Sequence, residues 1–276
     1  MRLAFSTLAC PSWPLDRVLA AARRLGYAGV ELRFLEDDDA LWARPELTGS
    51  GLAATRARLR DDGLAIACVD TRSFFHHPAG PARETALEEA RRALELAASL
   101  GAAGIRVFGD RIQAGQDRQS TRALIAEALA RLAEVAQAHG VEVWIESHGD
   151  FARGRDTLAA VEGLPSARVG VVWDPCNAFE VGEAPAEGLR ALGARARHVH
   201  LKDVGRDGPE GPWRPRLPGR GEFHPERVLA LLSARGYDGW VSFEWEKRWH
   251  PEIEEAEQAL AHFAAWAAAA LGGHRR

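Results

Sequence analysis

The sequence predicts an α/β protein that folds as a single (β/α)8 TIM barrel spanning residues 1–276. Short β-branched apolar runs alternate with amphipathic segments rich in Ala, Leu and Arg, and eight such units of roughly 34 residues match the size of this barrel. The alternative is a doubly wound open sheet, which normally carries a phosphate-binding glycine loop after a strand. No G-x-G-x-x-G motif follows a predicted strand, so the barrel is favoured.

The predicted strands are short and apolar, as expected for a parallel sheet buried on both faces. They cover residues 3–6, 29–32, 65–70, 104–108, 141–146, 169–173, 198–201 and 240–244. Helices are expected between them. The first begins near Pro14, a residue suited to a first turn, and ends at Gly26.

A longer helix is predicted over residues 121–139, with Ser120 as its candidate N-cap. Its expected apolar stripe comprises Leu124, Ala128, Leu132, Val135 and Ala136. Residues 204–223, in contrast, are predicted to be neither helix nor strand, because four prolines and several glycines interrupt them.

This long loop follows the seventh predicted strand, on the side where barrel enzymes carry their active sites. Its arginines are Arg206, Arg214, Arg216 and Arg220. One hypothesis is that the loop closes over an anionic substrate, phosphorylated or carboxylated, with arginines as clamps. The alternative is a solvated basic loop.

Composition excludes several classes of protein. The net charge of −4 lacks the excess of Lys and Arg expected of a nucleic-acid-binding protein. The longest apolar stretch has about 13 residues, fewer than the roughly 20 that a membrane-spanning helix needs. Three scattered cysteines are too few for a disulfide framework, which favours a cytoplasmic location.

Four late strands end in side chains that can bind a metal. Glu146 ends the fifth strand, Asp174 follows the sixth, His200 lies in the seventh and Glu244 ends the eighth. The carboxyl ends of barrel strands converge on one rim, so these side chains are expected close together. Three carboxylates alone would repel one another, and a divalent cation removes this penalty. For any single carboxylate, a helix cap or a salt bridge is the alternative role.

The donor set predicts the kind of ion. Oxygen donors with one imidazole favour Mn²⁺, Mg²⁺ or Co²⁺, whereas structural zinc sites usually contain thiolates. Zn²⁺ remains an alternative. Beside a metal-bound carbonyl, a carboxylate can remove a proton from carbon and return it, which gives epimerisation or isomerisation through an enediolate. Glu146 and Glu244 are the predicted acid/base pair.

Several strings of this sequence resemble the xylose-isomerase-like barrel superfamily, and within it the sugar phosphate isomerase/epimerase group that includes tagatose 3-epimerase and inosose isomerase. These strings are Ile145-Glu146-Ser147-His148, Trp173-Asp174-Pro175, His198-Val199-His200-Leu201-Lys202-Asp203 and Phe243-Glu244, and Gly219-Arg220-Gly221 resembles a turn of that group. The resemblance implies that Glu146, Asp174, His200 and Glu244 bind one catalytic metal, most often Mn²⁺. It also implies that the two glutamates act as acid and base.

Two positions depart from that group. Asn177 stands where many members have a histidine, and Ala152 stands where tagatose-type epimerases carry a second carboxylate. Asparagine can bind a sugar hydroxyl but does not titrate near neutral pH. Both departures weaken the inference that this chain acts on the same substrate as the tagatose-type epimerases, so the sequence does not specify a sugar, sugar phosphate or inosose.

The remaining candidates for substrate binding lie close to the predicted rim. They are His148, Asn177, Lys202, Arg206, Arg33, Trp13, Lys247 and Trp249. Lys202 and Lys247 are the only lysines among 35 basic residues, and both follow predicted metal ligands closely. A compact ammonium suits sites where the broad guanidinium does not fit. For each candidate, a structural salt bridge, a core position or a solvated surface is the alternative.

The predicted function is a metal-dependent isomerase or epimerase of a small carbohydrate. An inosose-type dehydratase is the alternative, because proton abstraction beside a carbonyl can also expel a hydroxyl. A nuclease similar to endonuclease IV and a non-catalytic sugar-binding protein are more remote, since the former needs more histidines at strand ends. Exposed aromatic residues such as Trp42 and Trp249 are compatible with a homodimer.

Overall fold

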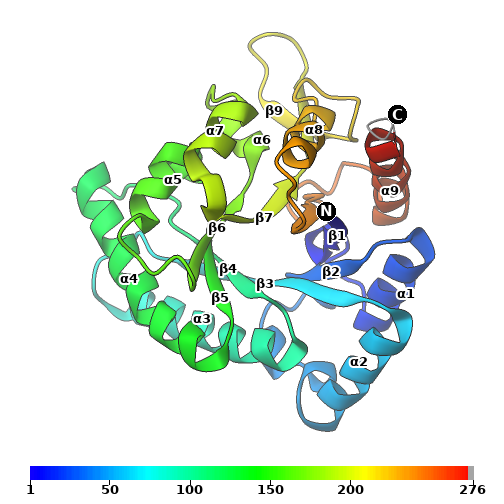
Figure 1. Cartoon of the computed structure of the whole chain (residues 1–276), viewed down its shortest axis with the longest axis horizontal. Coiled ribbons are helices and arrows are strands. Elements are labelled where there is room, and N and C mark those ends of the chain that lie inside the picture. The colour runs from blue at the N-terminus through cyan, green and yellow to red at the C-terminus, as the bar shows by residue number, and fades with distance from the viewer. Residues whose placement is uncertain (273–276) are drawn as a thin grey trace.

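A computed structural model of the protein describes residues 1–272 and contains a closed barrel of parallel strands surrounded by helices (Figure 1). The barrel strands are β1 (Arg2–Ser6), β2 (Gly29–Leu32), β3 (Ala65–Phe74), β4 (Gly104–Phe108), β5 (Glu142–Glu146), β6 (Val169–Trp173), β7 (Ala196–Leu201) and β10 (Trp240–Phe243). Strand β10 pairs with β1 and closes the barrel. The predicted (β/α)8 fold is confirmed, and each predicted strand lies within a few residues of an observed one.

The described helices mostly follow the barrel strands and cover the outside of the barrel (Figure 1). They are α1 (Leu15–Leu25), α2 (Gly49–Asp62), α3 (Pro81–Leu100), α4 (Arg118–His139), α5 (Gly154–Val161), α6 (Pro175–Glu180), α7 (Pro185–Leu192), α8 (Glu226–Ala234) and α9 (Ala256–Gly272). Short 3-10 turns lie at Thr7–Ala9, Leu41–Ala43, Pro45–Leu47, Gly149–Phe151 and Gly193–Arg195. The predicted ends of α1 are confirmed, since Pro14 precedes it and Gly26 ends it with a φ of 77°.

Helix α4 starts earlier than predicted. Its N-cap is Asp117, whose carboxylate accepts a hydrogen bond from the Ser120 amide at 2.7 Å. Ser120 therefore lies inside the first turn, and its prediction as the N-cap is wrong. Three residues of the predicted stripe, Ala128, Leu132 and Ala136, are buried, but Ile125 and Leu129 complete it in place of Leu124, which is only half-buried.

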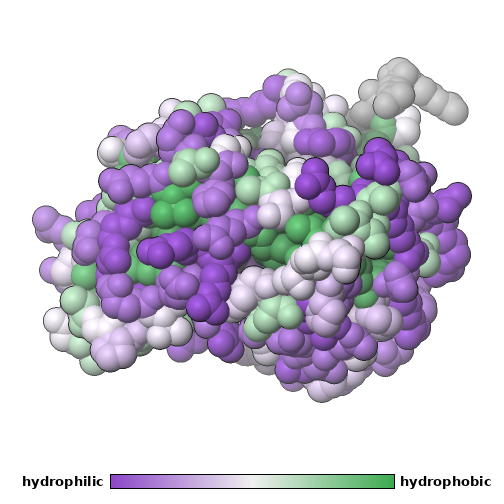
Figure 2. Space-filling view, turned by 90° about the horizontal axis from the view of Figure 1, so that it is seen from below, coloured by the Kyte–Doolittle hydropathy of each residue, from purple (hydrophilic) through white to green (hydrophobic). Residues whose placement is uncertain are grey.

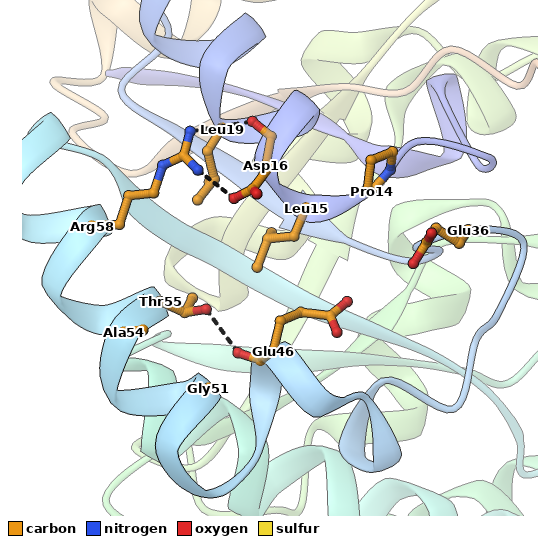
Figure 3. A pocket seen from close by; sticks show the side chains of 10 residues that line it. All are labelled: Pro14, Leu15, Asp16, Leu19, Glu36, Glu46, Gly51, Ala54, Thr55 and Arg58. Atoms are coloured by element: carbon orange, nitrogen blue, oxygen red, sulfur yellow. Dashed lines mark hydrogen bonds and ion pairs between the residues drawn. The ribbon is translucent and has the colours of Figure 1, made fainter.

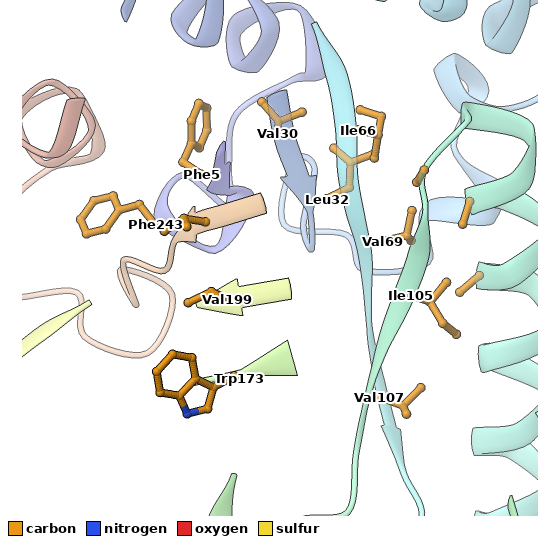
Figure 4. Packing of buried hydrophobic residues seen from close by; sticks show 14 of the residues in the cluster. Phe5, Val30, Leu32, Ile66, Val69, Ile105, Val107, Trp173, Val199 and Phe243 are labelled. Carbon is orange, nitrogen blue, oxygen red and sulfur yellow. The ribbon is translucent and has the colours of Figure 1, made fainter. Parts of the chain in front are cut away.

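The hydrophobic core fills the layer between the barrel and the helices. Alternate strand residues such as Val30, Ile66, Ile105 and Phe243 are buried in one cluster with helix residues (Figure 4). Each fully buried aliphatic side chain of this layer contributes about 1.5–3 kcal/mol through the hydrophobic effect. On one outer face, hydrophobic residues lie mostly in recesses between hydrophilic ones (Figure 2).

Two tryptophans fill the amino-terminal part of the barrel interior. The indoles of Trp144 and Trp240 are buried, and the strands beside them begin with glycine. A Cβ atom on Gly104 would lie 2.7 Å from the Trp144 ring, and one on Gly29 would lie 2.8 Å from the Trp240 ring. These glycines therefore make room for the indoles, and Ala4 and Ala67 pack with Trp240 while Cys68 and Val172 pack with Trp144.

Residues 204–223 contain more regular structure than predicted. Strands β8 (Asp203–Arg206) and β9 (Trp213–Arg216) form an antiparallel two-stranded sheet outside the barrel. The prediction that this segment contains no strand is wrong. Proline weakened the strand signal, but a two-stranded sheet has only edge strands, where Pro215 is tolerated opposite Val204.

Asp203 anchors this segment. Its carboxylate accepts hydrogen bonds from the backbone amides of Val204, Gly219, Gly221 and Phe223, at 2.9 to 3.3 Å. A Cβ atom at Gly221 would collide with the Asp203 carboxylate and the Val204 carbonyl oxygen. The Gly219-Arg220-Gly221 turn is thus shaped by the approach of its backbone to a buried carboxylate.

We expect Asp203→Asn to lower the free energy of unfolding by about 2–3 kcal/mol, because its NH2 group would replace an oxygen that accepts from two backbone amides and leave both unpaired. Urea denaturation measures this change. The matched control is Asp207→Asn, since Asp207 belongs to the same segment but its side chain is 69% exposed. Equal losses in the two variants would contradict the anchoring role of Asp203.

Candidate functional site

Four buried side chains converge at the carboxyl end of the barrel. Glu146 ends β5, Asp174 follows β6, His200 lies in β7 and Glu244 follows β10. One donor atom from each lies within 4.8 Å of all the others. The structure therefore brings together the four residues that the sequence singled out as metal ligands.

Hydrogen bonds orient the two acidic ligands from β5 and β6. The Oδ1 atom of Asp174 accepts hydrogen bonds from the amides of Cys176 and Asn177 and thereby caps α6, which leaves Oδ2 facing the cluster. The side-chain amide of Asn177 donates to Oε1 of Glu146 at 3.4 Å, which leaves Oε2 facing it. Capping and metal binding are thus compatible roles for Asp174, because each uses a different oxygen.

The imidazole of His200 is oriented from the other side. Its Nε2 atom lies 3.1 Å from Oε2 of Glu31, so a proton on Nε2 leaves the lone pair of Nδ1 free. Oε2 of Glu146, Oδ2 of Asp174 and Nδ1 of His200 are buried, and no group meets them with hydrogen-bond geometry; Lys202 and Glu244 contact the last two only as ion pairs, at 2.9 and 3.2 Å. Buried polar atoms normally find partners, so these three atoms fit a divalent cation held with Glu244.

Two buried cations balance the negative charge of the cluster. Nζ of Lys202 lies 2.9 Å from Asp174, 2.8 Å from Glu244 and 2.6 Å from Glu246, and Nε of Arg106 lies 3.3 Å from Glu146. Burial alone would raise the pKa of Glu244, but Lys202 and His200 hold it well below its usual range. Burial and the neighbouring glutamates raise the pKa of Asp174 to about 6.

A polar network behind the cluster was largely missed by the sequence reasoning. Glu31 lies 2.6 Å from Nε2 of His198 as well as contacting His200, and Asp70 pairs with Arg106 at 3.0 Å. The signal for Asp70 and Arg106 was present, since both lie near the ends of predicted strands, as the four ligands do.

A cavity of about 530 Å³ opens at the cluster and is large enough for a small substrate. Its lining comprises Leu8, Arg33, Phe34, Asp39, Arg72, Phe74, Arg106, Phe108, Asp110, Arg111, Glu146, His148, Lys202, Glu244, Glu246, Arg248 and Trp249. Four predicted substrate-binding residues are among them, namely Arg33, His148, Lys202 and Trp249. Asn177 is not, but it contacts Glu146.

His148 is held by a residue that the sequence did not indicate. Its Nδ1 atom lies 2.8 Å from Oδ1 of Asp110, and Asp110 has a φ of 62°, which is rare for a residue other than glycine. Such backbone strain tends to gather at functional sites. Although burial opposes protonation, Asp110 raises the pKa of the His148 imidazole.

Three other predicted substrate-binding residues are not among the cavity lining residues. Trp13 is buried beneath the guanidinium of Arg17, at 4.1 Å. Lys247 donates hydrogen bonds to two backbone carbonyls and pairs with Glu255 at 2.9 Å. Trp13 thus has a core position, and Lys247 stabilises the loop after β10.

Arg206 is the third of these residues. Its guanidinium stacks over Trp213 at 4.3 Å, donates to the Pro209 carbonyl and pairs with Glu222. Arg214 and Arg216 both pair with Asp207. The hypothesis of a basic clamp required these arginines to reach the substrate cavity, but none of them lines it.

Another cavity, of about 360 Å³, lies on the flank between α1 and α2 (Figure 3). Its walls include Leu15, Leu19 and Thr55, and an ion pair joins Asp16 to Arg58 across it. None of the predicted ligands or substrate-binding residues lines this cavity. The cavity at the barrel mouth, in contrast, is lined by the predicted ligands Glu146 and Glu244 and by four predicted substrate-binding residues.

Residues 19–266 match the model of a protein family described as xylose isomerase-like TIM barrel. The chain belongs to this family. The resemblance noted in the sequence is thereby confirmed, and the match covers every strand that supplies a member of the metal cluster.

Relatives of this xylose isomerase-like chain are named as isomerases, epimerases and dehydratases. The 2-oxo-tetronate isomerase of Cupriavidus necator is 29% identical over 254 residues, which cover 85% of this chain and 87% of the relative. Fructoselysine 3-epimerase of Escherichia coli O157:H7 is 27% identical over 147 residues, 51% of this chain and 52% of the relative. Inosose dehydratase of Clostridium beijerinckii is 26% identical over 141 residues, 45% of this chain and 47% of the relative. The chain thus spans about half the length of the last two.

Solved structures of similar fold include L-ribulose 3-epimerase, with a TM-score of 0.79 and 18% identity over 100% of this chain and 96% of that one. The IolI protein with a bound zinc atom has a TM-score of 0.78 and 17% identity, over 99% of both chains. At such identities the likeness shows the fold. The named relatives support an enzyme of the isomerase and epimerase kind. Within residues 1–272, no helix has the length and apolar character needed to cross a membrane.

Proposed function

We propose that the protein is a divalent-metal-dependent isomerase or epimerase of a small carbohydrate, which moves a proton on the carbon beside a carbonyl. The observation that carries the proposal is the convergence of Glu146, Asp174, His200 and Glu244 beside the cavity, with one donor atom of each within 4.8 Å of the others. The relatives named 2-oxo-tetronate isomerase and fructoselysine 3-epimerase support a reaction of the same kind.

Glu146 and Glu244 are the proposed acid and base. Both line the cavity, and both are carboxylates at neutral pH, because Arg106 and Lys202 offset the effect of burial on the pKa of each. A carboxylate at the cavity wall can take a proton from a substrate carbon and return it to the same or the neighbouring carbon. His148, held by Asp110, is placed to bind a substrate hydroxyl.

Glu146, Asp174, His200 and Glu244 would hold the ion, for which we propose Mn²⁺, with Mg²⁺, Co²⁺ or Zn²⁺ as alternatives. When bound, a divalent ion stabilises the negative charge that develops on a substrate oxygen. Lys202 and Glu31 position the donor atoms of this cluster through the contacts described above.

Incubation in D₂O with ketoses, inososes and their phosphates tests the reaction. An isomerase or epimerase incorporates deuterium at carbon, and mass spectrometry detects the added mass whichever product forms. A dehydratase instead releases water and forms a product lighter by that mass, which would favour the inosose dehydratases among the relatives. Neither change on any of these substrates would contradict the proposed function.

Metal removal should abolish deuterium incorporation and lower the melting temperature, because the cluster carboxylates would then repel one another. Metal analysis of protein purified without added metal should find about one divalent ion per chain, and Glu244→Gln should reduce this content. Wild-type protein that is free of metal, fully stable and active would exclude the proposed centre.

The proposal also concerns the cellular setting. The three cysteines, Cys10, Cys68 and Cys176, are free and buried, which supports a reducing, cytoplasmic compartment. The side chain of Trp249 is largely exposed at the cavity mouth, at 56%, and a homodimer that covers it stays a prediction.

A further inference from the structure

Arginines from four separate segments line one part of the cavity. Arg33 follows β2, Arg72 lies in β3, Arg111 follows β4 and Arg248 follows β10. Among the ion pairs of residues 1–272, none joins these four arginines to the carboxylates of the metal cluster. They therefore form a cationic group of their own, which we call the arginine wall.

The counter-charges of the arginine wall lie partly outside the cavity. Arg72 pairs with Glu89 at 2.9 Å and Arg248 pairs with Asp37 at 2.9 Å, but neither carboxylate lines the cavity. Within the lining, Asp39 is shared by two guanidinium groups, at 3.4 Å from Arg33 and 3.6 Å from Arg72. The cavity surface at this wall is therefore more positive than the count of ion pairs suggests.

Arg111 adds to this imbalance. It lies 3.6 Å from Asp110, whose carboxylate already binds His148 at 2.8 Å. Its own side chain is 76% exposed, so the pair contributes little to stability. Arg111 is thus free to turn toward a ligand.

Arg33 is the member of the wall with the least satisfied charge. Its residue is only 6% exposed, and the contact with Asp39 at 3.4 Å is the one side-chain hydrogen bond found for its guanidinium within residues 1–272. Burial and the nearby Arg106 lower the pKa of Arg33 to about 10, so it still carries its charge at neutral pH. A guanidinium has five N–H donors, and the contact with Asp39 uses one of those of Arg33, so others remain for a ligand in the cavity.

Aromatic rings hold two members of the wall, Arg33 and Arg248. The guanidinium of Arg33 stacks over Phe34 at 4.2 Å, and that of Arg248 lies 5.2 Å from the same ring and 6.0 Å from Trp249. Stacked guanidinium groups lose less conformational freedom when they bind an anion, which favours binding. The geometry is therefore that of a preformed anion site rather than of a flexible basic surface.

We propose that the arginine wall binds an anionic substituent of the substrate, a carboxylate or a phosphate, with Arg33 as its main partner and Arg72 and Arg248 beside it. This inference rests on the proposed function, since it places the reacting carbonyl at Glu146 and Glu244 and the anion at the wall. Both anions match the fork of a guanidinium, which can donate two parallel hydrogen bonds to them. The anionic substrate expected from the sequence is thus assigned to different arginines.

Calorimetric titration with matched ligands tests the proposal. The first set is fructose, fructose 6-phosphate and fructuronate, which share one carbonyl and differ at the far carbon, and the second is erythrulose and erythrulose 4-phosphate. At least one anionic ligand should bind tenfold or more tightly than its neutral counterpart, and the phosphate and carboxylate arms distinguish the two anions. If no anion binds more tightly than its neutral counterpart, the proposal is overturned.

Arg33→Met should remove this preference by lowering the ratio of anion affinity to neutral-sugar affinity at least tenfold. The matched control is Arg2→Met, because Arg2 also stacks on an aromatic ring, Trp240, at 4.1 Å but at the opposite end of the barrel. A bound metal ion would also attract anions. The test therefore compares the anion preference of the wild type, Arg33→Met and Arg2→Met, which all retain Glu146, Asp174, His200 and Glu244. Preference kept in Arg33→Met, or lost in Arg2→Met, would overturn the proposal.

Arg248→Met provides a second variant should Arg33→Met fold poorly, because Arg248 is more exposed, at 38% of its side chain. It should weaken anion binding threefold or more, and unchanged binding would count against the wall. The outcomes separate the two proposals. Binding of anions through Arg33 without deuterium incorporation would support the anion site and contradict the enzymatic function. Deuterium incorporation into neutral sugars without a preference for anions would support the enzymatic function and contradict the anion site.

Discussion

Glu146→Gln should lower kcat for deuterium incorporation by about a thousandfold or more, because it removes both a proton acceptor and a charged ligand of the cluster. The substitution preserves the shape of the side chain and its contact with the Asn177 amide at Oε1. It also removes the charge that faces Arg106 at 3.3 Å. Steady-state kinetics on whichever ketose shows incorporation gives the magnitude.

Metal content separates the two roles of Glu146. If Glu146→Gln retains the metal but loses incorporation, proton transfer is its main role, and if it loses both, binding of the ion dominates. Glu134→Gln is the matched control, since Glu134 is an exposed residue of α4, on the outside of the barrel. A fall in kcat of less than tenfold would contradict a role of Glu146 in the reaction.

The ligand cluster was predictable because it depends on strand order and strand ends alone. In a parallel barrel, a residue at the end of a strand has its position fixed by the fold, so Glu146, Asp174, His200 and Glu244 had to converge once the strands were correctly placed. The same rule places Asp70 and Arg106 nearby. They were missed because neither was expected to be a metal ligand. Arg106 balances the charge of Glu146, and Asp70 holds Arg106.

Residues on loops could not be placed in the same way. Lys247 and Arg206 lie close in sequence to predicted ligands, but each is drawn away by local partners, backbone carbonyls for Lys247 and Trp213 with Glu222 for Arg206. Arg33 was placed correctly because it directly follows a barrel strand. Asp110 gave no signal, because its contact with His148 joins residues 38 positions apart in the chain.

Lys202→Met should lower the free energy of unfolding of the metal-free protein by about 3–5 kcal/mol, which is the usual cost of leaving buried charges without their partner. Three carboxylates, of Asp174, Glu244 and Glu246, surround its ammonium within 2.9 Å, and the side chain is only 5% exposed. Lys202→Arg should also destabilise the protein, because the broad planar guanidinium does not fit a pocket shaped for a compact charge. Urea denaturation in the presence of a chelator measures both changes.

Lys247→Met is the matched control, because Lys247 is the other lysine of the chain. Its partners are two carbonyls and Glu255, which is 76% exposed, and water can replace its ammonium there, so we expect a loss of only about 1–2 kcal/mol. Mn²⁺ should stabilise Lys202→Met more than the wild type, since the ion would then be the main positive charge beside Asp174 and Glu244. Equal stabilisation of both proteins by Mn²⁺ would show that Lys202 and the ion act on separate carboxylates.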